Sequence, residues 1–215
     1  MKRHDLVLLD YEYCKSNKFL EFNQEEIETI LDWIYNQYPF IISKQGSIDN
    51  KKLNVGFMLP LEEGKKKINL TVKSDAVSEY LNPIKLFEIL PKINQKWNLP
   101  LRELLNSFLT LDLHLYVFGS SMWQYFLEKE YMTYKSDIDL LWKPTSVKQL
   151  NTGLIILKEC MEKYNLNIDG EIEFPCQSAC SWKELLTDDK KIIVKRLYKV
   201  SLESKIDLIN TLKGV

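Results

Sequence analysis

Several kinds of side chain are scarce in this chain of 215 residues. It has two histidines, His4 and His114, which are too few and too far apart in the sequence to form a histidine-based site. Lysine and arginine together number 29 against 30 aspartates and glutamates, and the two signs are interspersed. Such a chain lacks the broad basic surface that holds a polynucleotide, so we expect no nucleic-acid partner.

Long apolar runs are missing as well. No stretch approaches the roughly 20 apolar residues of a membrane span. The charged residues 1–5 lead into an apolar run of only four residues, shorter than the core of a signal peptide. We therefore expect a cytoplasmic protein without a membrane partner. Cys14, Cys160, Cys176 and Cys180 lack the paired close spacing of a zinc site, and we expect four free thiols.

The most informative pattern lies in the middle of the chain. Residues 113–118 predict a strand, because they are aliphatic, aromatic or β-branched, and the run stops at Gly119. Ser121 followed by Gln124 fits the capping box that opens a helix. The turn Gly119-Ser120 would then offer backbone N–H groups and the positive end of a helix dipole to a phosphate. Glycine is expected there because a Cβ would block the approach of the phosphate.

Two acidic residues follow at strand spacing. Asp137 and Asp139 alternate with Ile138 and Leu140, so the carboxylates would point to one side and the apolar side chains into the core. Two neighbouring carboxylates repel each other unless a cation lies between them. Because Mg²⁺ prefers oxygen ligands and usually retains substrate phosphates, the pair predicts a magnesium site that holds a polyphosphate.

A later acidic strand is predicted over residues 167–174. Acidic side chains alternate with apolar ones in this stretch, and Asp169 and Glu171 share a face. In a two-metal site, a third carboxylate ligates the second ion or takes the proton from an attacking hydroxyl. Either Asp169 or Glu171 fits that role, and the sequence does not choose between them.

The apolar periodicity predicts an α+β protein with two modules. We expect a small N-terminal α+β module over residues 1–100, with a helix opened by Asn23 and Glu26 and strands at 40–43, 53–59 and 67–73. Residues 101–215 are expected to form a catalytic domain with a mixed sheet flanked by helices. Its long helix would be opened by Ser146 and Gln149.

The glycine-serine turn and the paired aspartates resemble the nucleotidyltransferase superfamily built on the DNA polymerase β palm. A closer likeness extends nearly end to end, to the malonate decarboxylase holo-acyl carrier protein synthases, also called phosphoribosyl-dephospho-CoA transferases. The order and spacing of several short motifs are harder to match by chance than any one motif. The motifs that carry the likeness are Arg3-His4-Asp5-Leu6-Val7, Val117-Phe118-Gly119-Ser120, Trp123-Gln124, Tyr131, Ser136-Asp137-Ile138-Asp139-Leu140-Leu141, Asp169-Gly170-Glu171, Trp182-Lys183-Glu184 and Ile193-Val194-Lys195.

The resemblance implies a nucleotidyltransferase palm and a reaction. Enzymes of this kind take the 2'-(5''-triphosphoribosyl)-3'-dephospho-CoA precursor and attach its phosphoribosyl-dephospho-CoA group to a serine of the acyl carrier protein subunit of malonate decarboxylase, releasing diphosphate. Mg²⁺ would be the cofactor. The segment 23–97 matches this family only loosely, so no functional residue is carried over from it.

The resemblance also assigns roles to individual residues. Asp137 and Asp139 would hold the metal, and Gly119 and Ser120 would grip the β- and γ-phosphates. Asp169 or Glu171 would complete the site. Lys195 would contact a phosphate, although an ordinary lysine at a strand end would look the same. Lys183 would also bind a phosphate. It stands where the family more often has arginine, and lysine keeps the charge without the forked, bidentate geometry.

Two other functions remain open at this stage. An adenylyltransferase would keep the same fold and use ATP to modify a protein or a small molecule. A catalytically silent binding or assembly protein would keep only the fold, and intact Gly119, Ser120, Asp137 and Asp139 argue against it. The N-terminal module is absent from minimal nucleotidyltransferases and favours a larger donor or a protein acceptor.

Overall fold

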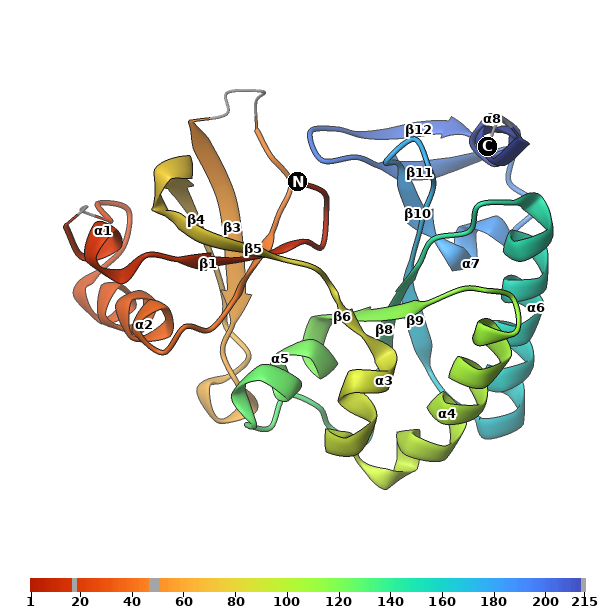
Figure 1. The fold of residues 1–215 in the computed structure, drawn as a ribbon, viewed down its shortest axis with the longest axis horizontal. Helices are drawn as coiled ribbons and strands as arrows, with labels where there is room; N and C mark the ends of the chain where they lie inside the picture. The colour runs from red at the N-terminus through yellow and green to blue at the C-terminus, as the bar shows by residue number, and fades with distance from the viewer. Residues whose placement is uncertain (17–18, 47–50, 214–215) are drawn as a thin grey trace. The chain divides into compact units, whose positions relative to one another are not determined.

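The computed structural model of the chain describes residues 1–16, 19–46 and 51–213. The chain forms two compact units of the α+β class, Met1–Pro83 and Ile84–Val215, each with a sheet of its own (Figure 1). Across the described part of the chain, no helix combines the length and the apolar character that crossing a membrane requires.

The first unit contains a five-stranded antiparallel sheet in the order β4-β3-β2-β1-β5. The predicted strands are confirmed as β2, β3 and β4, whereas β1 and β5 were not predicted. The bounds are β1 Leu6–Leu9, β2 Phe40–Ile42, β3 Lys52–Met58, β4 Lys67–Lys73, β5 Val77–Leu81, α1 Tyr11–Ser16 and α2 Gln24–Tyr35, with 3-10 turns at Leu61–Glu63 and Ser74–Ala76.

Helix α2 begins where the sequence predicts. The Asn23 side chain accepts from the Glu26 backbone N–H at 3.0 Å, and the Asn23 N–H donates to the Glu26 carboxylate at 3.2 Å. The helix buries Ile30 and Trp33 against the sheet, and the Trp33 ring stacks on Phe57 of β3 with centroids 4.1 Å apart. This packing forms the core of the first unit.

The second unit contains a seven-stranded sheet in the order β12-β11-β10-β9-β8-β7-β6. Neighbouring strands are antiparallel except β8 and β9, which are parallel and joined by helix α6, so the predicted mixed sheet is confirmed. The bounds are β6 Ile84–Lys85, α3 Leu86–Ile89, α4 Gln95–Leu109, β7 Leu115–Phe118, α5 Gly119–Leu127, β8 Ile138–Trp142, α6 Val147–Tyr164, β9 Ile168–Glu173, β10 Ala179–Ser181, α7 Trp182–Leu185, β11 Lys191–Lys195, β12 Val200–Ser204 and α8 Lys205–Asn210, with 3-10 turns at Leu90–Lys92 and Thr211–Lys213.

Helices α4 and α6 lie side by side and cover one face of this sheet (Figure 1). The Phe108 ring of α4 meets the edge of Trp142 in β8 at a centroid distance of 5.2 Å. A Cβ added to Gly153 of α6 would lie 2.6 Å from the same indole, so α6 approaches β8 closely. As predicted, Ser146 caps α6 by accepting from the Gln149 N–H. The acidic residues predicted for catalysis project from the other face.

The boundary between the units differs from the expected one. The sequence predicts a boundary after residue 100, but it lies after Pro83. Ile84 pairs with Val117 of β7, so β6 belongs to the second sheet. Pro100 lies inside α4 and is buried, rather than separating two elements. Proline removes one helical hydrogen bond without always ending a helix, and here tertiary packing outweighs that loss.

Candidate active site

The candidate site is centred on the junction between β7 and α5. β7 ends at Phe118, and α5 begins at Gly119 in the left-handed backbone region with a φ of +66°. A Cβ added to Gly119 would lie 2.0 Å from Oδ2 of Asp139. Asp139 is the partner of Phe118 in the antiparallel β7–β8 pair. The turn and the acid are therefore in direct contact, and any side chain at position 119 would have to displace the Asp139 carboxylate.

The paired aspartates have the burial that their spacing predicts. Ile138 and Leu140 are buried, at 0% and 1% exposure, whereas Asp137 and Asp139 are half-buried. Asp137 immediately precedes β8, and Asp139 lies within it. The two acids therefore flank a core residue at the end of the strand nearest the glycine turn.

The helix start at this turn differs from the prediction. The capping box expected from Ser121 and Gln124 is wrong, because α5 begins at Gly119 and the Ser121 hydroxyl instead donates to the Phe118 carbonyl at 3.3 Å. The Gln124 side chain accepts from the N–H groups of Tyr131 and Met132, both at 3.2 Å. Gln124 thus fixes the loop that leads from α5 to Asp137, a role that spacing alone did not reveal.

The two candidates for a third carboxylate lie on the same sheet face as Asp139. In the parallel β8–β9 pair, Asp169 is the partner of Asp139 and Glu171 is the partner of Leu141. Partners on neighbouring strands project to one side, and so do alternate residues of a strand. Asp139, Asp169 and Glu171 therefore share a face, and Asp169 is opposite Asp139.

The two predicted phosphate-binding lysines are ion-paired with these acids. Lys183 lies 3.5 Å from Asp169, and both side chains are more than 40% exposed. Lys195 lies 2.7 Å from Glu171, whose side chain is only 7% exposed. The structure therefore brings the four residues together on one face, as two pairs that differ in access to solvent.

A nearby thiol is not arranged for chemistry. Cys180 of β10 is a buried free cysteine. Burial, together with the negative charges of Glu184 and Glu171, raises the pKa of its thiol to about 12. A nucleophilic cysteine needs a lowered pKa, so this thiol stays protonated near neutral pH.

Two family models cover almost the whole chain. The model described as phosphoribosyl-dephospho-CoA transferase MdcG C-terminal domain matches residues 85–205, and the corresponding N-terminal domain model matches residues 2–83. The chain belongs to the phosphoribosyl-dephospho-CoA transferase family. It is therefore a transferase, and the two domain models meet where the structure divides the chain, after Pro83.

Curated relatives carry the same description. A phosphoribosyl-dephospho-CoA transferase of Xanthomonas axonopodis pv. citri is 27% identical over 76% of this chain and 77% of its own length. One from Bradyrhizobium diazoefficiens is 23% identical over 99% of this chain and 94% of its own. No solved structure matches the chain, so the likeness to the polymerase β palm rests on the motifs.

The donor atoms of this transferase suit a metal that arrives with its substrate. Among the residues that the structure describes, no three Asp, Glu, His or Cys side chains are grouped so that they could hold a metal ion. Asp139 lies against the glycine turn, and Asp137, two residues earlier in the chain, is half-buried as Asp139 is. Mg²⁺ is typically bound by one or two carboxylates, waters and substrate phosphates, so the pair fits that ion.

Proposed function

We propose that this chain transfers phosphoribosyl-dephospho-CoA from its triphosphoribosyl precursor to a serine of the acyl carrier protein subunit of malonate decarboxylase, with release of diphosphate. The main support is the contact between Gly119 and Asp139 at a helix start. This contact places the predicted phosphate-binding turn beside a predicted metal ligand. The family of the chain is named for the transfer of phosphoribosyl-dephospho-CoA.

The bonds that change define what the site must do. The carrier serine hydroxyl attacks the α-phosphorus and a new P–O bond forms. The bond between the α-phosphorus and the oxygen that bridges it to the β-phosphate breaks, and diphosphate leaves with that oxygen. The serine proton must go to a base within hydrogen-bond reach. We assign that role to Asp169, because it lies opposite Asp139 and its side chain is 41% exposed.

The other residues bind and orient the triphosphate. The first turn of α5 presents the positive end of the helix dipole at Gly119 and Ser120, where the β- and γ-phosphates would bind. Lys183, which is ion-paired with Asp169, would pair with a phosphate of the substrate instead and neutralise charge on the leaving diphosphate. Asp137 and Asp139 would hold Mg²⁺, which when bound supplies charge neutralisation for the polyphosphate.

Intact-mass measurement of the carrier tests this proposal. The purified protein is incubated with Mg²⁺, the triphosphoribosyl precursor or ATP, and the apo carrier subunit, and the carrier is then weighed. We expect a gain equal to phosphoribosyl-dephospho-CoA with the precursor. The gain should vanish with Asp137→Ala and with Asp139→Ala, and it should persist with Asp189→Asn, which alters an exposed acid of the same unit.

Three results would contradict the proposal. Addition of AMP from ATP in place of the precursor group would identify an adenylyltransferase. An unmodified carrier under all conditions would leave a binding protein. Equal activity of wild type and Asp139→Ala would remove Asp139 from the chemistry while leaving the family assignment intact.

A further inference from the structure

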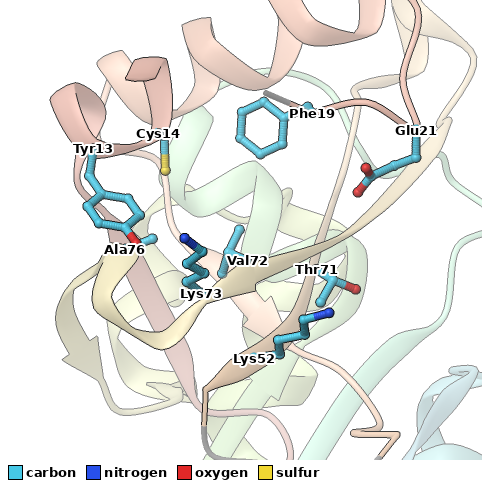
Figure 2. A pocket seen from close by; sticks show the side chains of 9 residues that line it. All are labelled: Tyr13, Cys14, Phe19, Glu21, Lys52, Thr71, Val72, Lys73 and Ala76. Carbon is cyan, nitrogen blue, oxygen red and sulfur yellow. The ribbon is translucent and has the colours of Figure 1, made fainter. Parts of the chain in front are cut away.

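The first unit contains a cavity of about 290 Å³, and none of its lining residues belongs to the candidate active site (Figure 2). Its size is near the lower end of pockets that bind small molecules. Its lining comes from α1, from Phe19 and Glu21, from strands β3 and β4, and from the turn after β4. The lining residues are Tyr13, Cys14, Phe19, Glu21, Lys52, Thr71, Val72, Lys73 and Ala76.

The cavity has an excess of positive charge. Lys52 and Lys73 are direct partners in the antiparallel β3–β4 pair, so their side chains leave the sheet at neighbouring positions. The Lys73 ammonium group points toward Cys14 and the Lys52 ammonium group toward Thr71 (Figure 2). Like charges placed opposite each other destabilise a strand pair. Within residues 1–16, 19–46 and 51–213, neither ammonium group has an ion pair, and Glu21 is the one carboxylate of the lining. A bound anion would relieve this repulsion.

The walls are apolar and aromatic. Phe19, Val72 and Ala76 are buried, at 8%, 6% and 1% exposure, and the Tyr13 ring lines the side formed by α1 (Figure 2). Burial, followed by the nearby charge of Asp10, raises the pKa of the Cys14 thiol to about 11, so Cys14 is a neutral wall residue. Aromatic side chains of this kind accept the planar face of a nucleobase.

Hydrogen-bond acceptors complete the lining. The Thr71 hydroxyl donates to the Asn54 side chain at 2.8 Å, so its oxygen presents acceptor lone pairs. The Glu21 carboxylate is also an acceptor. An exocyclic amine on a base, such as the 6-amino group of adenine, is the matching donor. Rings, acceptors and ammonium groups therefore occupy one small cavity.

We propose that this cavity binds an adenosine phosphate, with the base against the aromatic wall and the phosphate at Lys52 and Lys73. The proposal goes beyond the transfer reaction, because all lining residues lie in Met1–Pro83 and none has been assigned to catalysis. Two sources share this chemistry: the adenosine diphosphate part of dephospho-CoA and a free adenine nucleotide.

Calorimetric titration of the full chain tests the site. The Asp139→Asn variant serves as the background, so that binding at the candidate active site is weakened. AMP and dephospho-CoA are compared with adenosine, which lacks the phosphate, and with pantetheine 4'-phosphate, which lacks the base. We expect AMP and dephospho-CoA to bind at least about ten-fold tighter than either partial ligand, and added salt to weaken their binding.

Charge reversal on one strand supplies matched variants. Lys73→Glu should weaken AMP binding by about ten-fold or more. Lys67→Glu changes an exposed lysine at the other end of β4 that does not line the cavity, and it should leave the affinity unchanged. Equal affinities of Lys73→Glu and Lys67→Glu would overturn the proposal, as would the absence of AMP and dephospho-CoA binding. Equal binding of pantetheine 4'-phosphate and AMP would overturn recognition of the base.

A kinetic comparison then separates the two sources. If the cavity holds part of the donor, Lys73→Glu in an otherwise wild-type chain raises the KM for the precursor while kcat stays unchanged. If it holds a free nucleotide, AMP binding is lost and that KM does not change. Both results support an adenosine phosphate site, and neither depends on which acceptor the catalytic unit modifies.

Discussion

At the residue scale, Gly119 and Asp139 form one structural unit, because the glycine leaves the space that the carboxylate occupies. The glycine has a left-handed φ, and its α-carbon lies against the carboxylate of the next strand. The absence of a side chain therefore does two things, since it permits the backbone turn and leaves room for the acid. The sequence motif predicts glycine at position 119 because a phosphate must approach the backbone. The structure adds a second reason for glycine, because the Asp139 carboxylate occupies the space of a Cβ.

Replacing this glycine separates the two effects. Gly119→Ala should abolish or strongly reduce transfer, by about a hundred-fold or more, because its Cβ must displace the carboxylate that we propose as a ligand of Mg²⁺. Gly64→Ala is a matched control: Gly64 has a φ of +74° but no atom within 4 Å of an added Cβ. Both variants should lose about 1 kcal/mol of unfolding free energy from backbone strain.

Carrier mass and urea unfolding measure these two quantities. A Gly64→Ala variant as inactive as Gly119→Ala would show that strain, rather than contact with Asp139, explains the loss. An active Gly119→Ala variant would show that the carboxylate tolerates displacement.

Asp169 and Glu171 should respond differently to loss of charge. Asp169 is 41% exposed beside Lys183, whereas Glu171 is 7% exposed and bound to Lys195 at 2.7 Å. Asp169→Asn removes the assigned proton acceptor, so kcat should fall about a hundred-fold or more with little change in stability. Glu171→Gln leaves Lys195 without its ionic partner, so thermal stability should fall more than kcat.

Steady-state kinetics and thermal unfolding of the two variants distinguish these roles. A larger loss of kcat in Glu171→Gln than in Asp169→Asn would exchange the assignments. A wild-type kcat in both would place the base outside strand β9.

At the scale of elements, local patterns predicted helix starts well when a side chain could cap the backbone directly. Asn23 and Ser146 both do so, and α2 and α6 begin where their spacing indicates. Ser121 failed as a cap because Gly119 can adopt the left-handed turn, so the helix starts earlier. The hydrogen bonds that the Gln124 side chain accepts illustrate the limit, because the donors Tyr131 and Met132 are brought near it only by the loop after α5.

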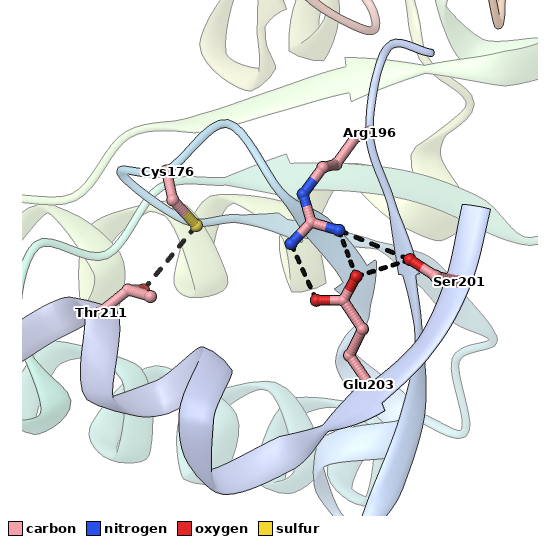
Figure 3. Close-up of polar contacts among 5 residues, drawn as sticks. All are labelled: Cys176, Arg196, Ser201, Glu203 and Thr211. Carbon is pink, nitrogen blue, oxygen red and sulfur yellow. Dashed lines mark hydrogen bonds and ion pairs between the residues drawn. The ribbon is translucent and has the colours of Figure 1, made fainter. Parts of the chain in front are cut away.

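Arg196 and Glu203 connect the two strands of the β11–β12 hairpin (Figure 3). Arg196 donates through both terminal nitrogens to the Glu203 carboxylate, with Nη2 to Oε2 at 2.8 Å, and the Ser201 hydroxyl donates at 2.5 Å. Hydrogen bonds from Arg196 and then Ser201 lower the pKa of Glu203 from its ordinary value of 4.5 to about 2. The charged carboxylate therefore favours the folded state.

The pH dependence of this pair follows from the direction of the shift. Its contribution is fully present above about pH 4.5 and is lost as pH falls through about 2. Because the side chains are about one-third exposed, Glu203→Gln should cost only about 1 kcal/mol near neutral pH. Urea unfolding of wild type and variant should show this difference shrinking as the pH is lowered toward 3.

An exposed acid provides the comparison. Glu162 lies 3.9 Å from Lys158 on α6 with its side chain 67% exposed, so Glu162→Gln should change the unfolding free energy by only a few tenths of a kcal/mol. A difference for Glu203→Gln that does not shrink on acidification would assign the stabilisation to packing instead of charge.

At the scale of the whole molecule, the two-module organisation followed from periodicity, but the position of the boundary did not. Strand β6 has only two residues, and it becomes recognisable only through its pairing with β7. In the same way, β1 lies between β2 and β5, which are distant in sequence. Short strands carry little periodicity, and the partner that stabilises each one is chosen by tertiary contacts.

The position of the boundary can be tested with two fragments of the second unit. Residues 84–215 retain β6, α3 and all of α4, so this fragment should unfold cooperatively. A fragment of residues 101–215, which starts at the boundary expected from sequence, loses the buried side chains of Leu86, Ile89 and Trp97. Each such side chain contributes about 1.5–3 kcal/mol. Their sum is comparable to the total stability of a domain, about 5–15 kcal/mol.

The shorter fragment should therefore lack a cooperative thermal transition and fixed tertiary structure. Near-ultraviolet circular dichroism reports the packing of the tryptophans, including Trp142 beneath α4, so its signal should be present for residues 84–215 and lost for residues 101–215. Equal cooperativity of the two fragments would mean that β6, α3 and the first turns of α4 add little to this core. A disordered longer fragment would mean that the second unit needs the first in order to fold.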